Sequence, residues 1–215
     1  MVTNLSQSSS IFNQFIAEIR DEQVQKDAMR FRRNMERIAE ILGYELSKKL
    51  PYQKVEVKTP LGISSEYSLK EKPVLATILR AGLAMHNGLL NVFDSCDSAF
   101  ISAYRKHTTP EEFDIYVEYM AAPQLDNKIW IISDPMLATG NSMVTVYQAM
   151  LEVGKPKQVF IVSAIATPEA LDMINKNFPE NTEVFVGAID NELTSQSYIV
   201  PGLGDAGDLA YGEKL

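Results

Sequence analysis

Alternating strands and helices limit the folds open to this chain more than any other feature. Between residues 73 and 188, short apolar runs alternate with segments whose apolar residues recur at helical spacing. We expect strands at 73–79, 99–103, 129–132, 159–166 and 183–188, and helices at 83–92, 143–153 and 168–175. Strands joined by helices form βα units, so the pattern predicts an α/β fold with a twisted, mostly parallel sheet flanked by helices.

Two other segments predict strands of a different kind. Along 113–119, Phe113, Ile115, Val117 and Tyr119 alternate strictly with polar or half-polar residues. This alternation is typical of an antiparallel or edge strand with one face in water. A short strand is also expected at 55–57, followed by a turn at 59–62.

The first fifty residues predict two helices. Residues 1–10 are polar, and we expect them to be loose. Ser10 is placed to cap a helix that runs through Ile19, and a longer helix is expected over 25–49, with Pro51 as its stop. The second helix carries four arginines, which we interpret as a solvated face or interface rim rather than a phosphate site: Arg30, Arg32, Arg33 and Arg37.

Composition excludes several classes of protein. The 215 residues, 46% of them hydrophobic, are enough for one domain over 1–215 with its own core. The net charge of -8 argues against a general nucleic-acid binder, which neutralises phosphates with Lys and Arg. Cys96 is the only cysteine, which excludes an internal disulfide. With no basic leader and no apolar run near the roughly 18 residues of a membrane span, we expect a cytoplasmic protein.

The sequence DPMLATGNS, residues 134–142, connects an expected strand to an expected helix. Ligands of parallel sheets bind where strands end, and free N–H groups at a helix entrance can hold a phosphate. Gly140 permits close approach or a positive φ, Thr139 and Ser142 could add hydroxyl donors, and Asp134 could accept from ribose hydroxyls. The loop lacks the Gly-Lys-Ser/Thr ending of a nucleoside-triphosphate loop. It therefore predicts a sugar-phosphate site, although a simple helix cap fits the same residues.

Two more stretches favour a ligand site. Arg80, in ILRAGL, follows the strand at 73–79 and lies where it could fork onto a diphosphate or pair with a structural carboxylate. The sequence YIVPGLGDAGD, residues 198–208, is glycine-rich but begins with residues too apolar for a flexible tail. We expect this segment to close on something.

With these stretches in view, the chain closely resembles the uracil phosphoribosyltransferase family. ILRAGL, DPMLATG and YIVPGLGDAGD match its signature segments in order, and VEVKTPLG and YRKHTT fall where the family has similar segments. The resemblance implies a type I phosphoribosyltransferase fold with a β hood and N-terminal helices. It implies transfer of phosphoribose from 5-phosphoribosyl-1-diphosphate (PRPP), with Mg²⁺, to uracil, giving UMP and diphosphate in pyrimidine salvage. It also implies a homodimer or larger homo-oligomer. The net charge of -8 and the lack of a long apolar run predict no nucleic-acid or membrane partner.

The same resemblance assigns residues to roles. The PRPP-binding residues are Arg80, Arg105, Asp134, Pro135, Met136, Leu137, Ala138, Thr139, Gly140, Asn141, Ser142 and Asp205. The uracil-binding residues are Ile199, Gly204, Asp205 and Ala206. Arg80, Arg105, Asp134 and Asp205 are the expected catalytic residues, with Asp205 facing the magnesium ion through water.

The chain departs from the family pattern at a few positions. Asn141 stands where the family often has a second glycine, and we expect a minor effect because Asn tolerates unusual φ. Lys106 and His107 replace a more acidic stretch after Arg105, and we interpret them as facing water. Leu209 replaces a basic residue and Glu213 a threonine, which bears on how the C-terminal segment closes.

Three single residues outside these motifs carry expectations of their own. His86 is interpreted as a helix-surface or interface residue rather than a catalyst. Cys96 is expected to be packed or partly exposed, and Trp130 to lie in the core.

Alternatives to this enzyme stay open at this point. One is a catalytically weak regulator that senses PRPP or UMP in the same pocket, since a fold does not fix a function. Another is the same transfer to a different base. The joint presence of Arg80, Arg105, Asp134 and Asp205 favours the enzyme. Activation by a nucleotide such as GTP is a question that the sequence leaves open.

Overall fold

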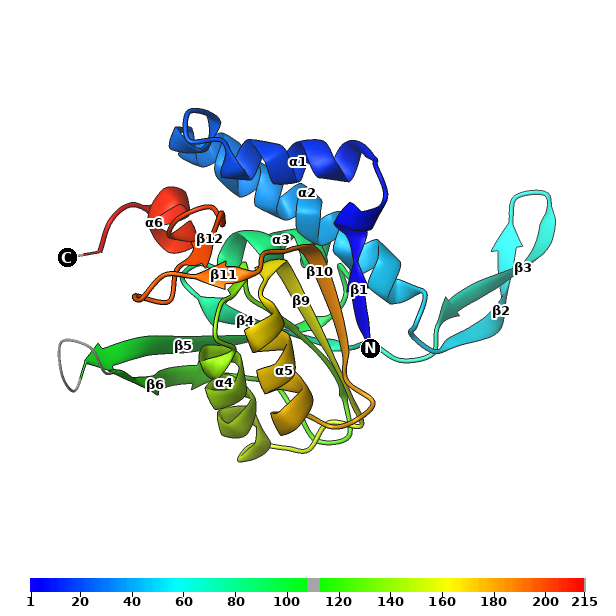
Figure 1. Ribbon diagram of the computed structural model, residues 1–215. Helices are drawn as coiled ribbons and strands as arrows, with labels where there is room; N and C mark the ends of the chain where they lie inside the picture. The colour runs from blue at the N-terminus through cyan, green and yellow to red at the C-terminus, as the bar shows by residue number, and fades with distance from the viewer. Residues whose placement is uncertain (108–112, 215) are drawn as a thin grey trace.

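The computed structural model describes residues 1–107 and 113–214, with only the backbone described for 104–107 and 113–115. Within this part of the chain, eight strands form one central sheet (Figure 1). In pairing order, they are β1 (Val2–Asn4), β10 (Glu183–Ile189), β9 (Gln158–Ala166), β7 (Ile129–Ser133), β4 (Val74–Leu79), β5 (Asp97–His107) and β6 (Phe113–Ala121), with β8 (Met136–Leu137) also paired to β9. Only the β5–β6 pair is antiparallel among the pairs of this sheet, so the mostly parallel sheet predicted from the βα pattern is confirmed.

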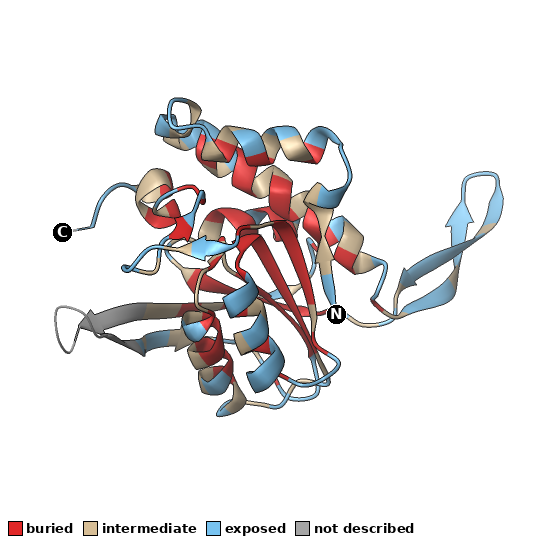
Figure 2. Ribbon diagram, in the orientation of Figure 1, coloured by how far each residue is buried: buried red, intermediate tan, exposed pale blue. Residues whose placement is uncertain are grey.

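Helices cover both faces of the sheet. On one side, the core cluster contains residues of α1 (Ile11–Arg20), α2 (Ala28–Ser47) and α3 (Leu83–Val92). On the other side, it contains residues of α4 (Asn141–Leu151) and α5 (Pro168–Asn177). Burial is concentrated in the strands and on the helix surfaces that face them (Figure 2).

Strand β7 shows how one strand serves both cores. Ile129 and Ile131 belong to the cluster with α1, α2 and α3, whereas Trp130 and Ile132 belong to the cluster with α4 and α5. Side chains alternate between the faces of a strand, so a strand buried on both faces needs a continuous apolar run. The expected core position of Trp130 is confirmed, because its side chain is fully buried and its indole N–H donates to the Leu125 carbonyl at 2.9 Å.

The prediction of β6 as an antiparallel edge strand is confirmed, but the orientation of Tyr119 was predicted wrongly, and the side chains of Phe113 and Ile115 lie outside the described residues. It pairs antiparallel with β5, but the register shifts by one residue opposite Ser102 and Ala103. A β-bulge of this kind reverses the side-chain alternation beyond it. Tyr119, which the alternation placed on the apolar side with Val117, is therefore exposed, and Met120 packs against the core instead.

The N-terminus is ordered, which corrects the expectation of a loose start. β1 pairs in parallel with β10, and the turn η1 (Leu5–Gln7) follows it. The Met1 ammonium donates to the Thr182 carbonyl at 3.1 Å, and the Ser6 hydroxyl donates to the Gly187 carbonyl at 2.5 Å. The prediction was wrong because it judged side-chain polarity, whereas these contacts use backbone partners on a neighbouring strand.

Helix α2 begins later than expected. A short turn, η2 (Val24–Lys26), precedes it, and Asp27 caps it by accepting a hydrogen bond from the backbone N–H of Arg30 at 3.1 Å. The predicted cap of α1 is confirmed, because the Ser10 hydroxyl accepts from the backbone N–H of Phe12 at 3.2 Å.

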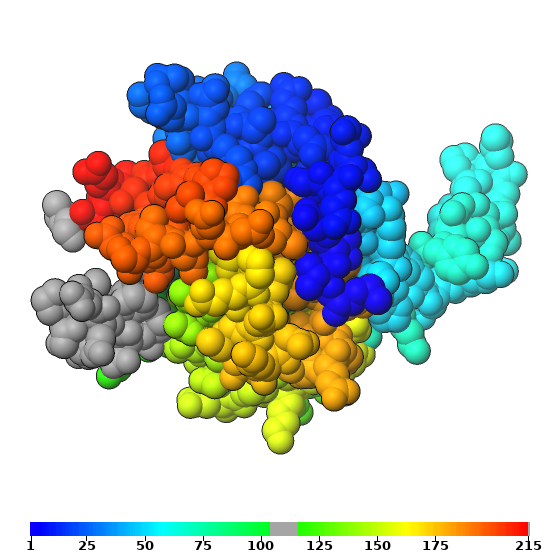
Figure 3. Space-filling view, in the orientation of Figure 1, coloured from blue at the N-terminus to red at the C-terminus, as the bar shows by residue number. Residues whose placement is uncertain are grey.

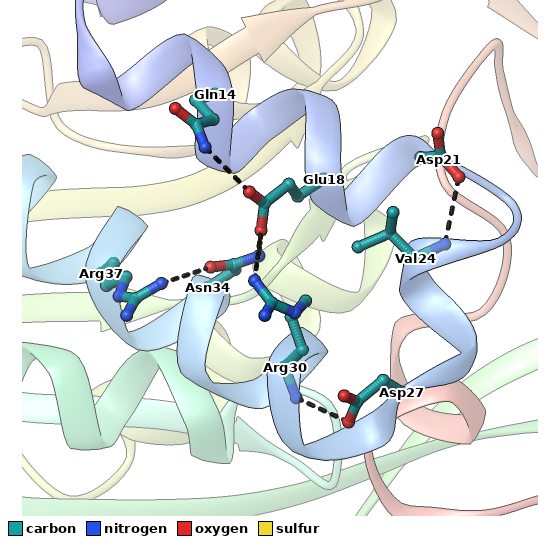
Figure 4. A network of polar contacts seen from close by, with 8 residues as sticks. All are labelled: Gln14, Glu18, Asp21, Val24, Asp27, Arg30, Asn34 and Arg37. Carbon is teal, nitrogen blue, oxygen red and sulfur yellow. Dashed lines mark hydrogen bonds and ion pairs between the residues drawn. The ribbon is translucent and has the colours of Figure 1, made fainter.

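A polar network fastens α1 to α2 (Figure 4). The Glu18 carboxylate accepts hydrogen bonds from Asn34 at 2.7 Å, Gln14 at 3.1 Å and Arg30 at 3.3 Å. The bond from buried Asn34 has the largest effect among these in lowering the pKa of Glu18. Arg37 in turn donates to the Asn34 side-chain oxygen at 3.0 Å. Two of the four clustered arginines thus serve the packing of the helix pair.

Two strands form a hairpin that projects from the body of the molecule (Figures 1 and 3). β2 (Tyr52–Thr59) and β3 (Gly62–Leu69) pair only with each other among the described strands. The sequence predicted the start of this hairpin and its turn, but not β3, whose run of serines has no strong strand signal.

His86 lies inside the protein, which corrects its expected surface position. Its side chain is buried, its Nε2 lies 3.0 Å from the Ser98 hydroxyl, and its ring meets that of Phe100 edge-on. Burial lowers the pKa of His86 to about 4, so the imidazole is neutral near pH 7. Cys96 is partly exposed, as expected, and burial of its thiol raises its pKa to about 11.

Candidate functional site

The loop at 134–142 forms a helix entrance, as the sequence predicted. It follows β7, contains β8 and leads into α4, which begins at Asn141. Gly140 takes the position before the helix with a left-handed backbone, φ +82°, and no side chain caps the helix. Asn141 N lies a long 3.4 Å from the Thr139 hydroxyl. Backbone N–H groups in the first turn of a helix that lacks a side-chain cap are suited to an anion.

Gly140 could not be another residue without a rearrangement. A Cβ added there would lie 3.0 Å from the Cβ of Met173 and 3.1 Å from the Ala170 carbonyl oxygen, both on α5. Its positive φ is also one that side chains with a Cβ rarely adopt. The loop therefore approaches α5 closely, and this packing holds the helix entrance in place.

Asp134 follows β7 at the start of the loop. Its backbone N–H donates to the Val162 carbonyl at 3.1 Å, which fixes it to the middle of β9. Desolvation raises the pKa of its carboxyl to about 7, and a hydrogen bond from the backbone of Met136 acts in the opposite direction. A desolvated carboxyl that still has acceptor capacity suits a ligand hydroxyl.

Arg80 lies at the same edge of the sheet. β4 and β7 are parallel neighbours, with Thr77 opposite Ser133, so their carboxyl ends meet. The Arg80 guanidinium donates to the Asp208 carboxylate at 2.8 Å and to the Gly212 carbonyl at 3.2 Å, and its side chain is 40% exposed. The structure thus brings Arg80 to the C-terminal segment.

Arg105 is placed only by its backbone. It lies on β5 opposite Ile115, and β5 is the parallel neighbour of β4. Its side chain, like those of Lys106 and His107, lies outside the described residues.

The C-terminal segment is folded rather than loose. β11 (Glu192–Leu193) pairs with β12 (Ile199–Val200), and α6 (Ala206–Tyr211) follows. Ile199 and Ala206 are buried in the core that contains α1, α2 and α3. Arg32, on α2, donates to the Ala210 carbonyl at 2.6 Å. In Figure 3, this segment covers the surface beside the N-terminal helices.

Sequence reasoning missed α6, although a signal for it exists. The Asp205 carboxylate accepts a hydrogen bond from the backbone N–H of Asp208 at 3.0 Å, three residues on, and so caps the helix. Aspartate before a short run with buried Ala206 and Ala210 is a helix-start pattern, but the glycines around it hid the pattern. The second Asp205 oxygen lies 3.6 Å from the Lys214 ammonium.

Arg80 and the start of the 134–142 loop follow neighbouring parallel strands, and Arg80 contacts the C-terminal segment. A surface hollow of about 480 Å³ lies elsewhere, between β6 and α4, and none of the assigned residues lines it. Among the described residues, no cluster of three or more His, Cys, Asp or Glu side chains could hold a metal ion. In the same part of the chain, no helix combines the length and apolarity needed to cross a membrane.

Comparisons with known proteins show the family of the chain. A family model described as uracil phosphoribosyltransferase matches residues 6–213. A uracil phosphoribosyltransferase of Porphyromonas gingivalis is 52% identical, with 100% of this chain and 99% of the relative covered. One of Pyrococcus furiosus is 36% identical, with 97% and 89% covered.

Solved structures give the class of fold. A protein of Aquifex aeolicus has a TM-score of 0.87 at 32% identity, with 99% of this chain and 98% of the other covered. A hypoxanthine phosphoribosyltransferase of Staphylococcus aureus has a TM-score of 0.51 at 17% identity, with 74% of each chain covered, which is a likeness of fold alone. The sheet order and this likeness give the chain a type I phosphoribosyltransferase fold. Within that class, the chain belongs to the uracil phosphoribosyltransferase family.

Proposed function

We propose that residues 1–215 act as one cytoplasmic phosphoribosyltransferase domain that transfers phosphoribose from PRPP to uracil, giving UMP and diphosphate. The observation that carries this proposal is that Arg80, which follows β4 beside the strand leading into the 134–142 loop, contacts the C-terminal segment. The family's reaction needs three parts, and the chain has a candidate for each. They are the uncapped entrance of α4, Arg80 after β4, and the C-terminal segment that contacts Arg80.

PRPP lies along the loop in this proposal. Backbone N–H groups from 137–142, with the Thr139 and Ser142 hydroxyls, hold the 5-phosphate, and Asp134 accepts from the ribose hydroxyls. The pKa of the Asp134 carboxyl is raised to about 7. Hydrogen bonds from the ribose hydroxyls would favour its charged form. Arg80 and Arg105 contact the diphosphate at the other end.

The chemistry is mainly electrostatic in this proposal. As the bond to the anomeric carbon breaks, positive charge grows on the ribose and negative charge on the diphosphate. Arg80 and Arg105 stabilise the leaving group, and the loop holds the sugar in line with the base. No lone side chain is assigned as a general base, and Asp205 acts through water.

Uracil binds at the C-terminal segment. Its N3–H donates while O2 and O4 accept, so backbone groups of Ile199, Gly204 and Ala206 can recognise it. A Cβ built at Gly204 would meet no described atom within 4 Å, which leaves room for a base against the backbone. Cytosine reverses the pattern at two positions and would leave groups unpaired, at about 1–3 kcal/mol for each.

Asp205 is the residue that we propose for magnesium. Carboxylate and phosphate oxygens are the ligands that Mg²⁺ prefers, and Asp205 keeps a partly exposed carboxylate in the segment that contacts Arg80. When bound, the ion neutralises charge on the leaving group. Asp205 would hold it through water.

The first prediction is the substrate profile. With PRPP and Mg²⁺, the protein should convert uracil to UMP and leave cytosine, hypoxanthine and orotate at less than about a hundredth of that rate. The assay separates bases and nucleotides by chromatography, with a chelator as the control that stops turnover. Binding of PRPP or UMP without turnover would instead identify a regulator, and preference for another base would overturn uracil as the substrate.

The second prediction concerns a homo-oligomer. The β2–β3 hairpin exposes Leu61, Ile63 and Tyr67 at 100%, 73% and 68%, and an isolated two-stranded hairpin is barely stable in water. Light scattering should give at least twice the chain mass of 24.0 kDa. Ile63→Lys should shift the protein toward the monomer, whereas Ser68→Lys, on the other face of β3, should not. A monomeric parent protein would contradict the assembly.

A further inference from the structure

A partly buried ion pair lies next to the C-terminal segment. Arg20, the last residue of α1, and Asp190, the residue after β10, form a two-pronged pair with N–O distances of 2.8 and 2.9 Å. Their side chains are 21% and 8% exposed, against 48% and 23% for the surface pair of Arg33 and Glu36. Neither residue belongs to the site assigned from the family resemblance.

The pair holds both backbone groups of Gly202. Arg20 Nη1 donates to the Gly202 carbonyl at 3.0 Å, and the Gly202 N–H donates to Asp190 Oδ2 at 3.0 Å. Gly202 has a positive φ of +54°, and a Cβ there would lie 2.1 Å from the Ile199 carbonyl oxygen. Only glycine fits this turn, and the ion pair fixes both the N–H and the carbonyl group of Gly202.

The same pair is anchored to the rigid body of the protein. The Asp190 N–H donates to the Ala166 carbonyl at 2.9 Å, at the end of β9. Arg20 ends a helix whose inner residue Ile19 is fully buried. Gly202 lies three residues after Ile199 and three before Asp205, so it sits in the middle of the segment proposed to bind uracil. The pair therefore connects the sheet and α1 to the centre of that segment.

Stability alone is a weak reason for this arrangement. Burying two charges is costly, and an apolar pair of similar volume often stabilises a fold as well or better. What an apolar pair cannot supply is a directed hydrogen bond to the carbonyl and another to the N–H of one residue. The arrangement specifies where a stretch of backbone lies.

Building on the proposed function, we propose that Arg20 and Asp190 are positioning residues for base binding. They hold the backbone of the segment from Ile199 to Ala206 at the spacing that uracil requires. They act through Gly202 and touch neither substrate. Base recognition by backbone groups depends on such an anchor, because a backbone shift moves donors and acceptors together.

The test compares the KM for uracil with the KM for PRPP in two variants. Arg20→Lys keeps the positive charge but loses the two-pronged geometry of the guanidinium. Asp190→Asn keeps the shape of the side chain but loses its negative charge. In each variant, the KM for uracil should rise roughly tenfold or more, while the KM for PRPP changes less than about twofold. The matched control is Arg30→Lys, which alters an arginine–carboxylate pair between α1 and α2 away from the C-terminal segment, and should leave both constants unchanged.

Each outcome decides the proposal. A role in stability alone would lower the folded fraction, and hence kcat, with both Michaelis constants unchanged; that result, or an equal rise in both constants, overturns it. So does loss of the native circular dichroism spectrum in both variants, which would make the pair a requirement for folding. Absence of uracil turnover in the parent protein would overturn the proposed function itself, and calorimetric titration with UMP would then report on the segment directly.

Discussion

Arg80→Ala should lower kcat for UMP formation by about a hundredfold or more, with the fold intact. The guanidinium is a described cation that follows β4, where the diphosphate is proposed to bind, and the loss of a preorganised donor to a leaving group typically has this effect. Its side chain is 40% exposed and packs into no core cluster, so the melting temperature should change little. Steady-state turnover with saturating uracil and PRPP gives kcat, and circular dichroism follows the fold.

Two controls separate the roles that Arg80 could have. Arg80 also pairs with Asp208 and contacts Gly212, so its removal frees the C-terminal segment as well. Asp208→Asn breaks the pair but keeps the arginine. If Asp208→Asn lost as much turnover as Arg80→Ala, the arginine would act by holding that segment. Arg33→Ala removes an exposed, ion-paired arginine of α2 and should leave turnover unchanged. Normal turnover in Arg80→Ala would remove this residue from the mechanism.

The sheet could be predicted because its strands are buried on both faces. A continuous run such as Ile129–Ile132 leaves little choice of structure, and the helices between such runs fix parallel pairing. The helix at 83–92 was predicted at its observed bounds, and the α4 entrance within two residues. Local apolar periodicity specifies these elements without help from distant residues.

The elements that were missed depend on distant partners. β1 is a strand because β10 offers it a free edge, and nothing in residues 1–10 encodes that edge. The local sequence predicts a surface position for His86, yet its side chain is buried against Ser98 and Phe100 of β5. The bulge that exposes Tyr119 likewise depends on the register with β5. In each case, tertiary contacts override the local pattern.

The site was predicted unevenly for the same reason. The loop motif predicts a helix entrance that contains a glycine, and Gly140 lies there with a left-handed backbone conformation. Arg20 and Asp190 stand 170 residues apart, and Gly202 follows 12 residues after Asp190. No local pattern relates them, and the sequence around Arg20 predicts only a helix that runs through Ile19. Long-range ion pairs of this kind become visible only in three dimensions.

Gly140→Val should weaken PRPP binding roughly tenfold to a hundredfold. Valine is β-branched and disfavours the left-handed backbone at φ +82°, a strain on the order of 1–3 kcal/mol. Its Cβ would also meet Met173 and Ala170 at 3.0 and 3.1 Å, so the start of α4 must shift. The N–H groups that are proposed to hold the 5-phosphate would move with it. Isothermal titration calorimetry with PRPP and Mg²⁺ measures the change.

Gly62→Val is the matched control for this substitution. Gly62 lies at the hairpin turn, where an added Cβ meets no described atom within 4 Å and φ is not positive. The two variants make the same chemical change, but only one of them disturbs the helix entrance. PRPP affinity should therefore fall in Gly140→Val and stay at the parent value in Gly62→Val. If Gly140→Val folds and still binds PRPP with the parent affinity, the phosphate is held elsewhere, because a helix entrance that has moved cannot keep the same hydrogen bonds to it.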